Sequence, residues 1–218
     1  MKHNLYRKYF KRLMDIIVGL LGTAVFLVSY IFVAPAILLT DGRPVLYKSK
    51  RRGKRDKVFD MYKYRSMYVN APDIRNADNS TFNGKNDPRV TKIGRFLRET
   101  SLDEIPQFLN VLKGDMSFVG PRPSVPSMPY ADIPEYEKKK LEVKSGITGY
   151  TQAFYRNAIS REKRFEMDAY YAENVSFALD MKIIFRTFSR IFSRKGVYIE
   201  ADQAKSGTNN GQNEGTKV

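Results

Sequence analysis

An uncharged segment near the N-terminus constrains the fold of this chain more than any other feature. The residues from Ile16 to Thr40 include no charged side chain. As a straight helix this segment would extend roughly 37 Å, enough to cross a hydrocarbon core of about 30 Å. A cleaved signal peptide is the alternative, but the segment exceeds a usual signal core and lacks a small-residue cleavage site before Asp41. We therefore expect a membrane segment that stays in the protein.

The charges on either side of this segment argue against a simple span. Basic residues lie before it (Lys2, Arg7, Lys8, Lys11, Arg12) and after it (Arg43, Lys48, Lys50, Arg51, Arg52, Lys54, Arg55, Lys57). Under the positive-inside rule both ends prefer the cytosol. A segment that enters the membrane, bends and returns satisfies both ends, and Ser29 and Pro35 are the expected bend points. The flanks alone leave spanning and re-entrant helices equally open.

Composition narrows the chemistry. Lys and Arg number 38 against 23 Asp and Glu, and the net charge of +15 favours anionic partners such as nucleic acid, acidic membranes or phosphorylated metabolites. The basic residues cluster around the membrane segment, which argues against nucleic acid. Because the chain has no cysteine and only one histidine, His3, thiol chemistry, Ser-His triads and Cys/His zinc sites are disfavoured. An enzyme of this composition would use carboxylates, basic side chains, hydroxyls and a hard metal such as Mg²⁺.

The rest of the chain reads as an irregular α/β (α+β) domain over residues 43–200, after a membrane part over residues 1–42. Residues 45–47 and 58–67 alternate like hairpin strands around the basic turn RRGKR, which is either a solvated charge run or a contact for anionic lipid. Helices are expected at 92–97, 102–113, 135–141, 159–174 and 176–193, with a long loop at 69–89. The last helix is amphipathic and is expected at the core or the bilayer interface. Residues 201–218 read as a disordered polar tail.

The stretch SLDEIPQFLNVLKG carries two adjacent carboxylates, Asp103 and Glu104. Its apolar residues repeat at helical spacing, so both carboxylates should lie in the first turn of a helix. One reading is a capping box, with Ser101 as N-cap and Glu104 reaching back to it. The other is functional, because a helix N-terminus keeps a carboxylate ionised for nucleophilic attack or metal binding.

The sequence Gly-Pro-Arg-Pro follows this stretch and ends at Pro123. Pro121 and Pro123 fix the backbone around Arg122, which would pre-orient its guanidinium for a phosphate. A rigid surface turn is the alternative. Arg98 lies just upstream of the carboxylates, and its presence with Arg122 favours the functional reading of the acidic pair.

These motifs together resemble the bacterial sugar transferases. The resemblance is carried by Lys11-Arg12 with Asp15, YKYRSM, DPRVTKIGRFLRETSLDEIPQFLNVLKGDMSFVGPRP, SGITGYTQA and RNAIS, and it extends from about Arg7 to Tyr198. In particular, the chain resembles the small monotopic polyprenyl-phosphate phosphoglycosyl transferases that begin bacterial glycan assembly. An exopolysaccharide, a capsule, an O-antigen or a glycoprotein glycan would be the end product.

The resemblance implies a reaction and a set of site residues. Asp103 would attack a nucleotide-sugar, usually a UDP-sugar, releasing UMP and leaving an aspartyl phosphosugar that polyprenyl phosphate, typically undecaprenyl phosphate, then attacks. Glu104 would assist the Mg²⁺ that the family requires, near Asp103, or the incoming phosphate. The residues expected at the substrates are Arg98, Arg122, Lys63, Arg65, Pro121, Pro123, Gln152, Arg156 and Asn157, although loop hydrogen bonding would equally explain Gln152, Arg156 and Asn157.

The resemblance also implies a location. In the family the apolar segment is a re-entrant helix broken at a Ser-Pro pair, so the protein would lie on the cytosolic face of the bacterial cytoplasmic membrane, in contact with anionic lipid. This chain departs from that pattern, because Ser29 is followed by Tyr30 and the proline comes later, at Pro35. A membrane-anchored scaffold or an inactive relative is the rival interpretation. The sequence leaves open a homodimer and the identity of the sugar.

Overall fold

The computed structural model describes residues 5–74, 82, 84, 86–155 and 159–193. Its helices are the π-helix η1 (Tyr6–Phe10), α2 (Lys11–Asp41), α3 (Lys92–Glu99), α4 (Gln107–Lys113), α5 (Glu135–Lys138), α6 (Tyr150–Phe154), α7 (Arg161–Glu173) and α8 (Phe177–Ser193). Its 3₁₀ turns are η2 (Lys54–Asp56), η3 (Leu102–Glu104), η4 (Tyr130–Asp132) and η5 (Lys139–Glu142). Its strands are β1 (Leu46–Arg52), β2 (Val58–Tyr64), β3 (Ser117–Val119) and β4 (Gly146–Thr148). The expected polar tail lies outside the described residues.

The described chain combines helices with two small sheets, as the sequence predicted. β1 and β2 form an antiparallel hairpin with Leu46 opposite Tyr64 and Arg52 opposite Val58. β3 and β4 pair in parallel. The hairpin prediction is confirmed, but β1 extends through Arg51 and Arg52, so the first two residues of the basic RRGKR run lie in a strand. The chain reverses only after Gly53, through Arg55 and Asp56 with positive φ.

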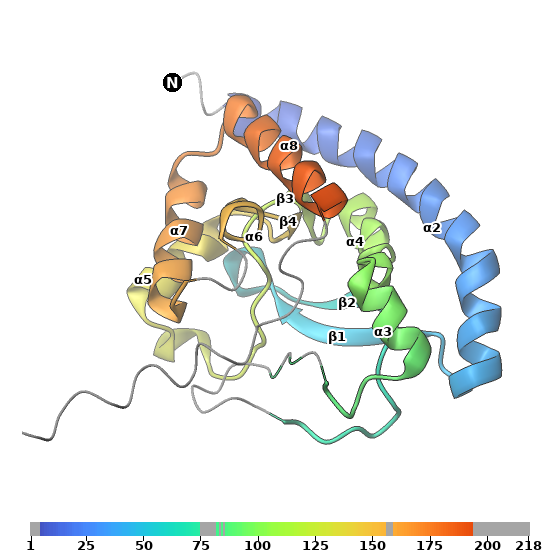
Figure 1. Ribbon diagram of the computed structural model, residues 1–218. Coiled ribbons are helices and arrows are strands. Elements are labelled where there is room, and N and C mark those ends of the chain that lie inside the picture. The colour runs from blue at the N-terminus through green and yellow to red at the C-terminus, as the bar shows by residue number, and fades with distance from the viewer. Residues whose placement is uncertain (1–4, 75–81, 83, 85, 156–158, 194–218) are drawn as a thin grey trace, which may run out of the picture.

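Helix α2 lies along the domain for its whole length. Figure 1 shows it following a curved path outside α4 and α3, with α8 beside its first turns. One face of α2 is buried, made of Lys11, Asp15, Gly19, Gly22, Phe26, Ala34 and Ile37. Its glycines permit the close approach to α4, because a Cβ on Gly22 would lie 2.1 Å from the Phe108 ring and one on Gly19 would lie 3.2 Å from the Leu112 backbone.

The opposite face of α2 is apolar and exposed. It carries Leu13, Ile17, Leu20, Leu21, Val25, Leu27, Val28, Ile31, Phe32, Leu38 and Leu39. Within the described residues, η1 and α2 together are the one helix long and apolar enough to cross a membrane. A continuous apolar surface of this size is typical of a membrane or protein contact.

A buried polar cluster holds the start of α2 against α8. Asp180 is fully buried on α8 and accepts hydrogen bonds from Lys11 Nζ at 2.6 Å, Tyr6 OH at 2.7 Å and Tyr171 OH at 2.7 Å. Nearby, the Asp15 carboxylate accepts from the Ser117 hydroxyl at 2.8 Å and from the Phe118 backbone N–H at 2.9 Å. These contacts join three segments that are distant in sequence.

The middle and the end of α2 are also fixed to the domain. The Ser29 hydroxyl donates to the Phe26 carbonyl at 2.9 Å and lies 2.8 Å from the Tyr64 hydroxyl of β2. Tyr30 stacks on Tyr64. Pro35 lies inside α2, which continues without a break to Asp41. The bend residues named from the sequence therefore lie in one continuous helix, and Ser29 and Tyr30 contact the hairpin.

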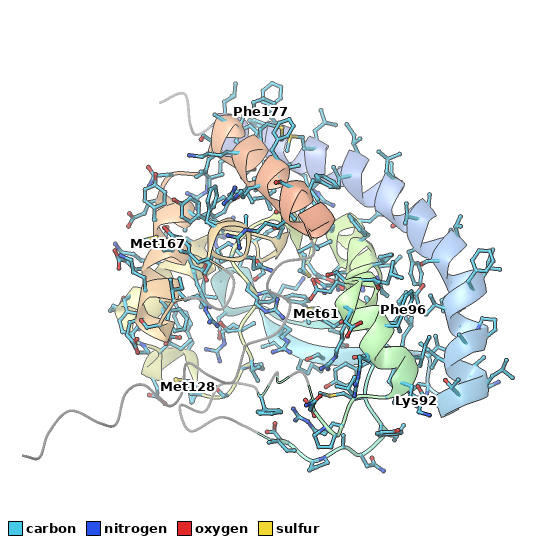
Figure 2. All side chains as sticks on the ribbon, in the orientation of Figure 1. Met61, Lys92, Phe96, Met128, Met167 and Phe177 are labelled. Carbon is cyan, nitrogen blue, oxygen red and sulfur yellow. The ribbon has the colours of Figure 1, made fainter. Side chains whose placement is uncertain are left out.

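Three apolar clusters form the core beneath these contacts. One joins the second half of α2 to the hairpin and α3 through Phe26, Ile37, Val45, Tyr64 and Leu97. A second joins the hairpin to α4, and a third lies among β3, α6, α7 and α8. Figure 2 shows Phe177 projecting from α8 at the top of the molecule, beside the start of α2. The exposed residues Phe177, Phe185 and Phe188 give α8 an aromatic face, while Ile183 is buried.

Replacing Asp180 tests the buried cluster. Asp180→Asn leaves the Lys11 ammonium buried without a counter-charge, so we expect it to lower the free energy of unfolding by about 3–5 kcal/mol. The matched control is Glu173→Gln, which removes another carboxylate 2.6 Å from a lysine, but in an exposed pair. Denaturant unfolding of both variants in detergent should show a large loss only for Asp180→Asn. Similar small losses would contradict the role of the cluster.

Candidate functional site

A shallow hollow lies where the hairpin, the acidic turn η3 and the Gly-Pro-Arg-Pro segment meet. Its polar walls come from Arg51, Lys63, Glu104, Gln107, Arg122 and Gln152, and its remaining walls from Met61, Pro123, Gly146 and Ile147. Figure 2 places Met61 near the centre of the molecule, beside α4. The polar side chains of the wall are mainly cations and amides, and Glu104 is the one carboxylate among them.

The acidic turn forms because Pro106 interrupts the expected helix. Proline has no N–H for the carbonyl four residues earlier, so a continuous α-helix from Leu102 is disfavoured. The chain instead makes the 3₁₀ turn η3 and begins α4 at Gln107. The capping-box interpretation is wrong, because Ser101 adopts a left-handed conformation with φ 59° and makes no side-chain cap bond. The Glu104 side chain bonds Lys63 rather than reaching back.

Lys63 connects the two carboxylates. Its Nζ lies 2.7 Å from Glu104 Oε1 and 3.6 Å from Asp103 Oδ2. Lys63 belongs to β2, where alternation puts it on the same face as Met61, which also lines the hollow. Asp103 is only 7% exposed and lies behind the lining residues. The structure therefore brings Lys63 to the centre of the predicted site.

The environments of the two carboxylates differ. Burial raises the pKa of Asp103, against the opposing charge of Lys63. Burial also disfavours ionised Glu104, but the charges of Lys63 and Arg122 outweigh it and lower the pKa of Glu104 to about 2. The expectation that a helix N-terminus holds both groups ionised is therefore wrong in its cause, and wrong in direction for Asp103. The site contains one firmly charged carboxylate and one poorly solvated carboxylate.

Arg122 stands at the mouth of the hollow. Its Nη1 lies 3.9 Å from Glu104 Oε1 and its side chain is half exposed. The preceding backbone is fixed by close packing, since a Cβ on Gly120 would lie 2.3 Å from the Lys144 carbonyl oxygen, and Pro121 accepts a hydrogen bond from Gly146. Pro123 lines the hollow. That the two prolines pre-orient Arg122 for a phosphate stays a prediction.

Two predicted arginines do not line the hollow. Arg98 donates from Nε to the Ser66 hydroxyl at 2.9 Å, and it influences Asp103 through its charge. Arg65 is buried and donates to the carbonyls of Asp41, Gly42 and Arg43 at 2.7–2.8 Å. Arg65 therefore closes the C-terminal end of α2 and does not reach the predicted substrate site.

Among the amides, Gln152 lines the hollow and donates to the Ile147 carbonyl at 3.0 Å, while its Oε1 is buried without a partner in the described chain. Arg156 and Asn157 lie outside the described residues. Sequence reasoning missed Gln107, which hydrogen-bonds Glu104, and Arg51, which was read as part of a basic turn. Strand alternation along β1 was the available signal for Arg51.

The donor set of the site limits what metal it can hold. Asp103 and Glu104 are adjacent carboxylates, and Mg²⁺ is commonly bound by one or two carboxylates together with substrate phosphates and water. Within the described residues, no group of three or more acidic, histidine or cysteine side chains gathers that could hold a metal alone. The acidic pair therefore fits an Mg²⁺ that is completed by phosphate oxygens.

Comparison with known proteins gives the family. The model of the family described as bacterial sugar transferase matches residues 6–194. An uncharacterized sugar transferase of Bacillus subtilis, EpsL, is 40% identical over 188 residues, which cover 86% of this chain and 89% of that protein. The UDP-glucose:undecaprenyl-phosphate glucose-1-phosphate transferase of Klebsiella pneumoniae is 41% identical over 196 residues, which cover 87% of this chain and 41% of that protein. The undecaprenyl-phosphate galactose phosphotransferase of Salmonella typhimurium is 40% identical over 171 residues, 72% of this chain and 35% of that protein.

The match to the family model covers most of the described chain, including the hairpin, the acidic turn and Arg122. The chain belongs to the bacterial sugar transferase family, and it is an enzyme of the phosphoglycosyl transferase class. It spans nearly the whole length of the Bacillus relative but less than half of the other two relatives named here.

Removing the cation between the carboxylates tests the electrostatics of the site. Lys63→Met leaves two neighbouring carboxylates without their shared partner, so we expect it to lower the free energy of unfolding by roughly 3 kcal/mol. Lys57→Met is the control, because Lys57 belongs to an exposed pair with Asp115 and should contribute about 0–1 kcal/mol. Denaturant titrations in detergent measure both. Equal effects would mean that Lys63 does not hold the acidic pair together.

Proposed function

We propose that this protein transfers a sugar-1-phosphate from a nucleotide-sugar, most simply a UDP-sugar, to undecaprenyl phosphate, releasing UMP. The observation that carries the proposal is the cluster of Glu104, Lys63 and Arg122 around one hollow, with Asp103 3.6 Å from Lys63. Carboxylate nucleophiles and fixed cations suit phosphoryl transfer, which depends on positioning and charge neutralisation. Relatives named as undecaprenyl-phosphate sugar phosphotransferases support the same reaction.

Asp103 is the proposed nucleophile. A carboxylate oxygen attacks the sugar-bearing phosphorus of the donor, the bond from this phosphorus to the bridging oxygen breaks, and UMP leaves with the electron pair. In a second step a phosphate oxygen of the polyprenyl carrier attacks the same phosphorus, and the Asp103 carboxylate leaves. Poor solvation of Asp103 supports this role, since little water must be removed before the attack. Two such steps constitute a covalent double displacement.

The remaining site residues have charge-balancing and positioning roles in this scheme. Lys63 neutralises charge beside both carboxylates, and Arg122 reaches a donor phosphate from the mouth of the hollow. Glu104, with its low pKa, stays anionic and suits a metal ligand. Mg²⁺, when bound with the phosphates, would supply further neutralisation of their charge. Gln152 has a free buried acceptor in the described chain for a donor N–H or hydroxyl of the substrate.

We also propose that the protein is monotopic on the cytosolic face of the bacterial membrane, with α2 entering and leaving the same leaflet. Both ends of α2 support this arrangement, because Lys11 is paired with Asp180 at one end and Arg65 binds the last carbonyls at the other. A helix fixed along its length to one polar domain cannot place its ends on opposite sides of a bilayer. Its exposed apolar face and the aromatic face of α8 would contact lipid. The product, a polyprenyl-diphosphate sugar, would begin a bacterial glycan.

Replacing the nucleophile tests the reaction. Asp103→Asn should lower UMP release from the accepted UDP-sugar by at least about 1,000-fold, because the amide oxygen cannot form the covalent phosphosugar. Asp60→Asn is the control, since Asp60 pairs with Lys50 on the exposed side of the hairpin. UMP release is measured with Mg²⁺, undecaprenyl phosphate and a panel of UDP-sugars. A folded Asp103→Asn protein with near-wild-type turnover would exclude Asp103 as the nucleophile.

Labelling of introduced cysteines tests the topology. The chain has no cysteine, so each introduced cysteine is a single reporter. Tyr9→Cys lies before α2 in the sequence and Tyr47→Cys lies after it, both at exposed positions. Both should resist a membrane-impermeant maleimide in intact spheroplasts and react in inverted membrane vesicles. Reaction of one reporter from outside the spheroplasts would show that α2 spans the bilayer.

A further inference from the structure

Arg51 is placed in the hollow by the last residues of β1. Because side chains alternate along a strand, Arg51 and Arg52 point in opposite directions. Arg52 does not line the hollow. Its Nε lies 2.9 Å from Asp56 Oδ1, and its guanidinium donates to the Met128 carbonyl. Arg51 lines the hollow with Glu104 and Arg122.

Arg51 has no anionic partner in the described part of the chain. No ion pair there joins it to a carboxylate, and its Nε is buried without a hydrogen-bond acceptor. Burial lowers the pKa of Arg51, and the neighbouring charge of Arg122 lowers it further. Two guanidinium groups side by side, one of them partly buried and unpaired, are unfavourable unless an anion joins them.

The charged side chains at the hollow contact one another in a series that begins at Asp103. Lys63 lies 3.6 Å from Asp103 and 2.7 Å from Glu104, and Arg122 lies 3.9 Å from Glu104. Arg51 lines the same hollow as Lys63, Glu104 and Arg122, whereas Asp103 does not line it. Within the described residues no ion pair joins Arg51 to either carboxylate, so Arg51 belongs to the wall of the hollow and not to the ion pairs around Asp103 and Glu104.

We propose that Arg51, together with Arg122, binds the phosphate that leaves with the nucleoside, and so stabilises the departing monophosphate. This inference rests on the proposed function. When Asp103 attacks in line, the bridging oxygen departs on the opposite side of the phosphorus and takes the electron pair. The negative charge that develops there lies away from Asp103, and in the wall of the hollow Arg51 offers it a planar fork of donors beside Arg122. The polyprenyl phosphate enters after the monophosphate has gone and attacks from the same side, opposite Asp103, so its phosphate meets the same two guanidinium groups.

Two-substrate kinetics test this assignment. In a double displacement, kcat/KM for the donor reports only the first step, and kcat/KM for the acceptor reports only the second. Arg51→Met should lower kcat/KM for the UDP-sugar by about 100-fold and weaken product inhibition by UMP by at least about 10-fold. It should also lower kcat/KM for undecaprenyl phosphate by at least about 10-fold, with an unchanged unfolding midpoint, because the acceptor phosphate attacks at the place that the monophosphate left. Arg51→Lys, which restores charge without the fork, should recover part of the loss.

Lys50→Gln is the matched control, because it removes one positive charge from the same strand at an exposed position paired with Asp60. It should leave both constants unchanged. A selective fall in the acceptor constant, no change in either constant, or an equal fall in both with a lowered unfolding midpoint would each overturn the assignment. Failure of the proposed function appears separately, as intersecting rather than parallel double-reciprocal lines for the wild-type enzyme.

Discussion

The buried ion pair between Lys11 and Asp180 fixes the start of the apolar helix to the domain. Burying two charges is costly, and the cost is offset here by hydroxyl donors from Tyr6 and Tyr171 on the same carboxylate. Arg65 performs the corresponding task at the other end of α2 by binding carbonyls that a helix C-terminus leaves unpaired. With both ends held, α2 must cover the hairpin and α4 with one face and present the other as apolar surface. The hollow is thereby held at a fixed position relative to that surface.

This fixed relation matters for a reaction between a soluble anion and a lipid phosphate. The hollow gathers Arg51, Lys63 and Arg122 around Glu104, with Asp103 behind them. Glu104 stays ionised because two cations face it, and Asp103 is poorly solvated because the turn buries it. A difference in environment between adjacent carboxylates is a common way to give two identical groups separate roles. The absence of cysteine and the single histidine do not restrict such chemistry.

The sequence predicted the features that depend on local pattern. Helical spacing located α3, α7 and α8, alternation located the hairpin, and the uncharged segment located α2. The start of α4 could not be predicted, because Pro106 favoured a 3₁₀ turn over the capping box that Ser101 suggested. Contacts between segments that are distant in the sequence could not be predicted either. The pairing of Lys63 with Glu104, the burial of Arg65 under the end of α2 and the orientation of Arg51 all depend on how the hairpin packs against η3.

Intact-protein mass spectrometry would show whether Asp103 carries the sugar phosphate from the UDP-sugar to undecaprenyl phosphate. The wild-type protein would be mixed with its UDP-sugar and Mg²⁺ without acceptor, then quenched in acid. We predict an added mass of one sugar phosphate, located on the peptide that contains Asp103, that disappears when undecaprenyl phosphate is supplied. Formation of lipid-linked product by a protein that never gains this mass would contradict the account and favour direct transfer.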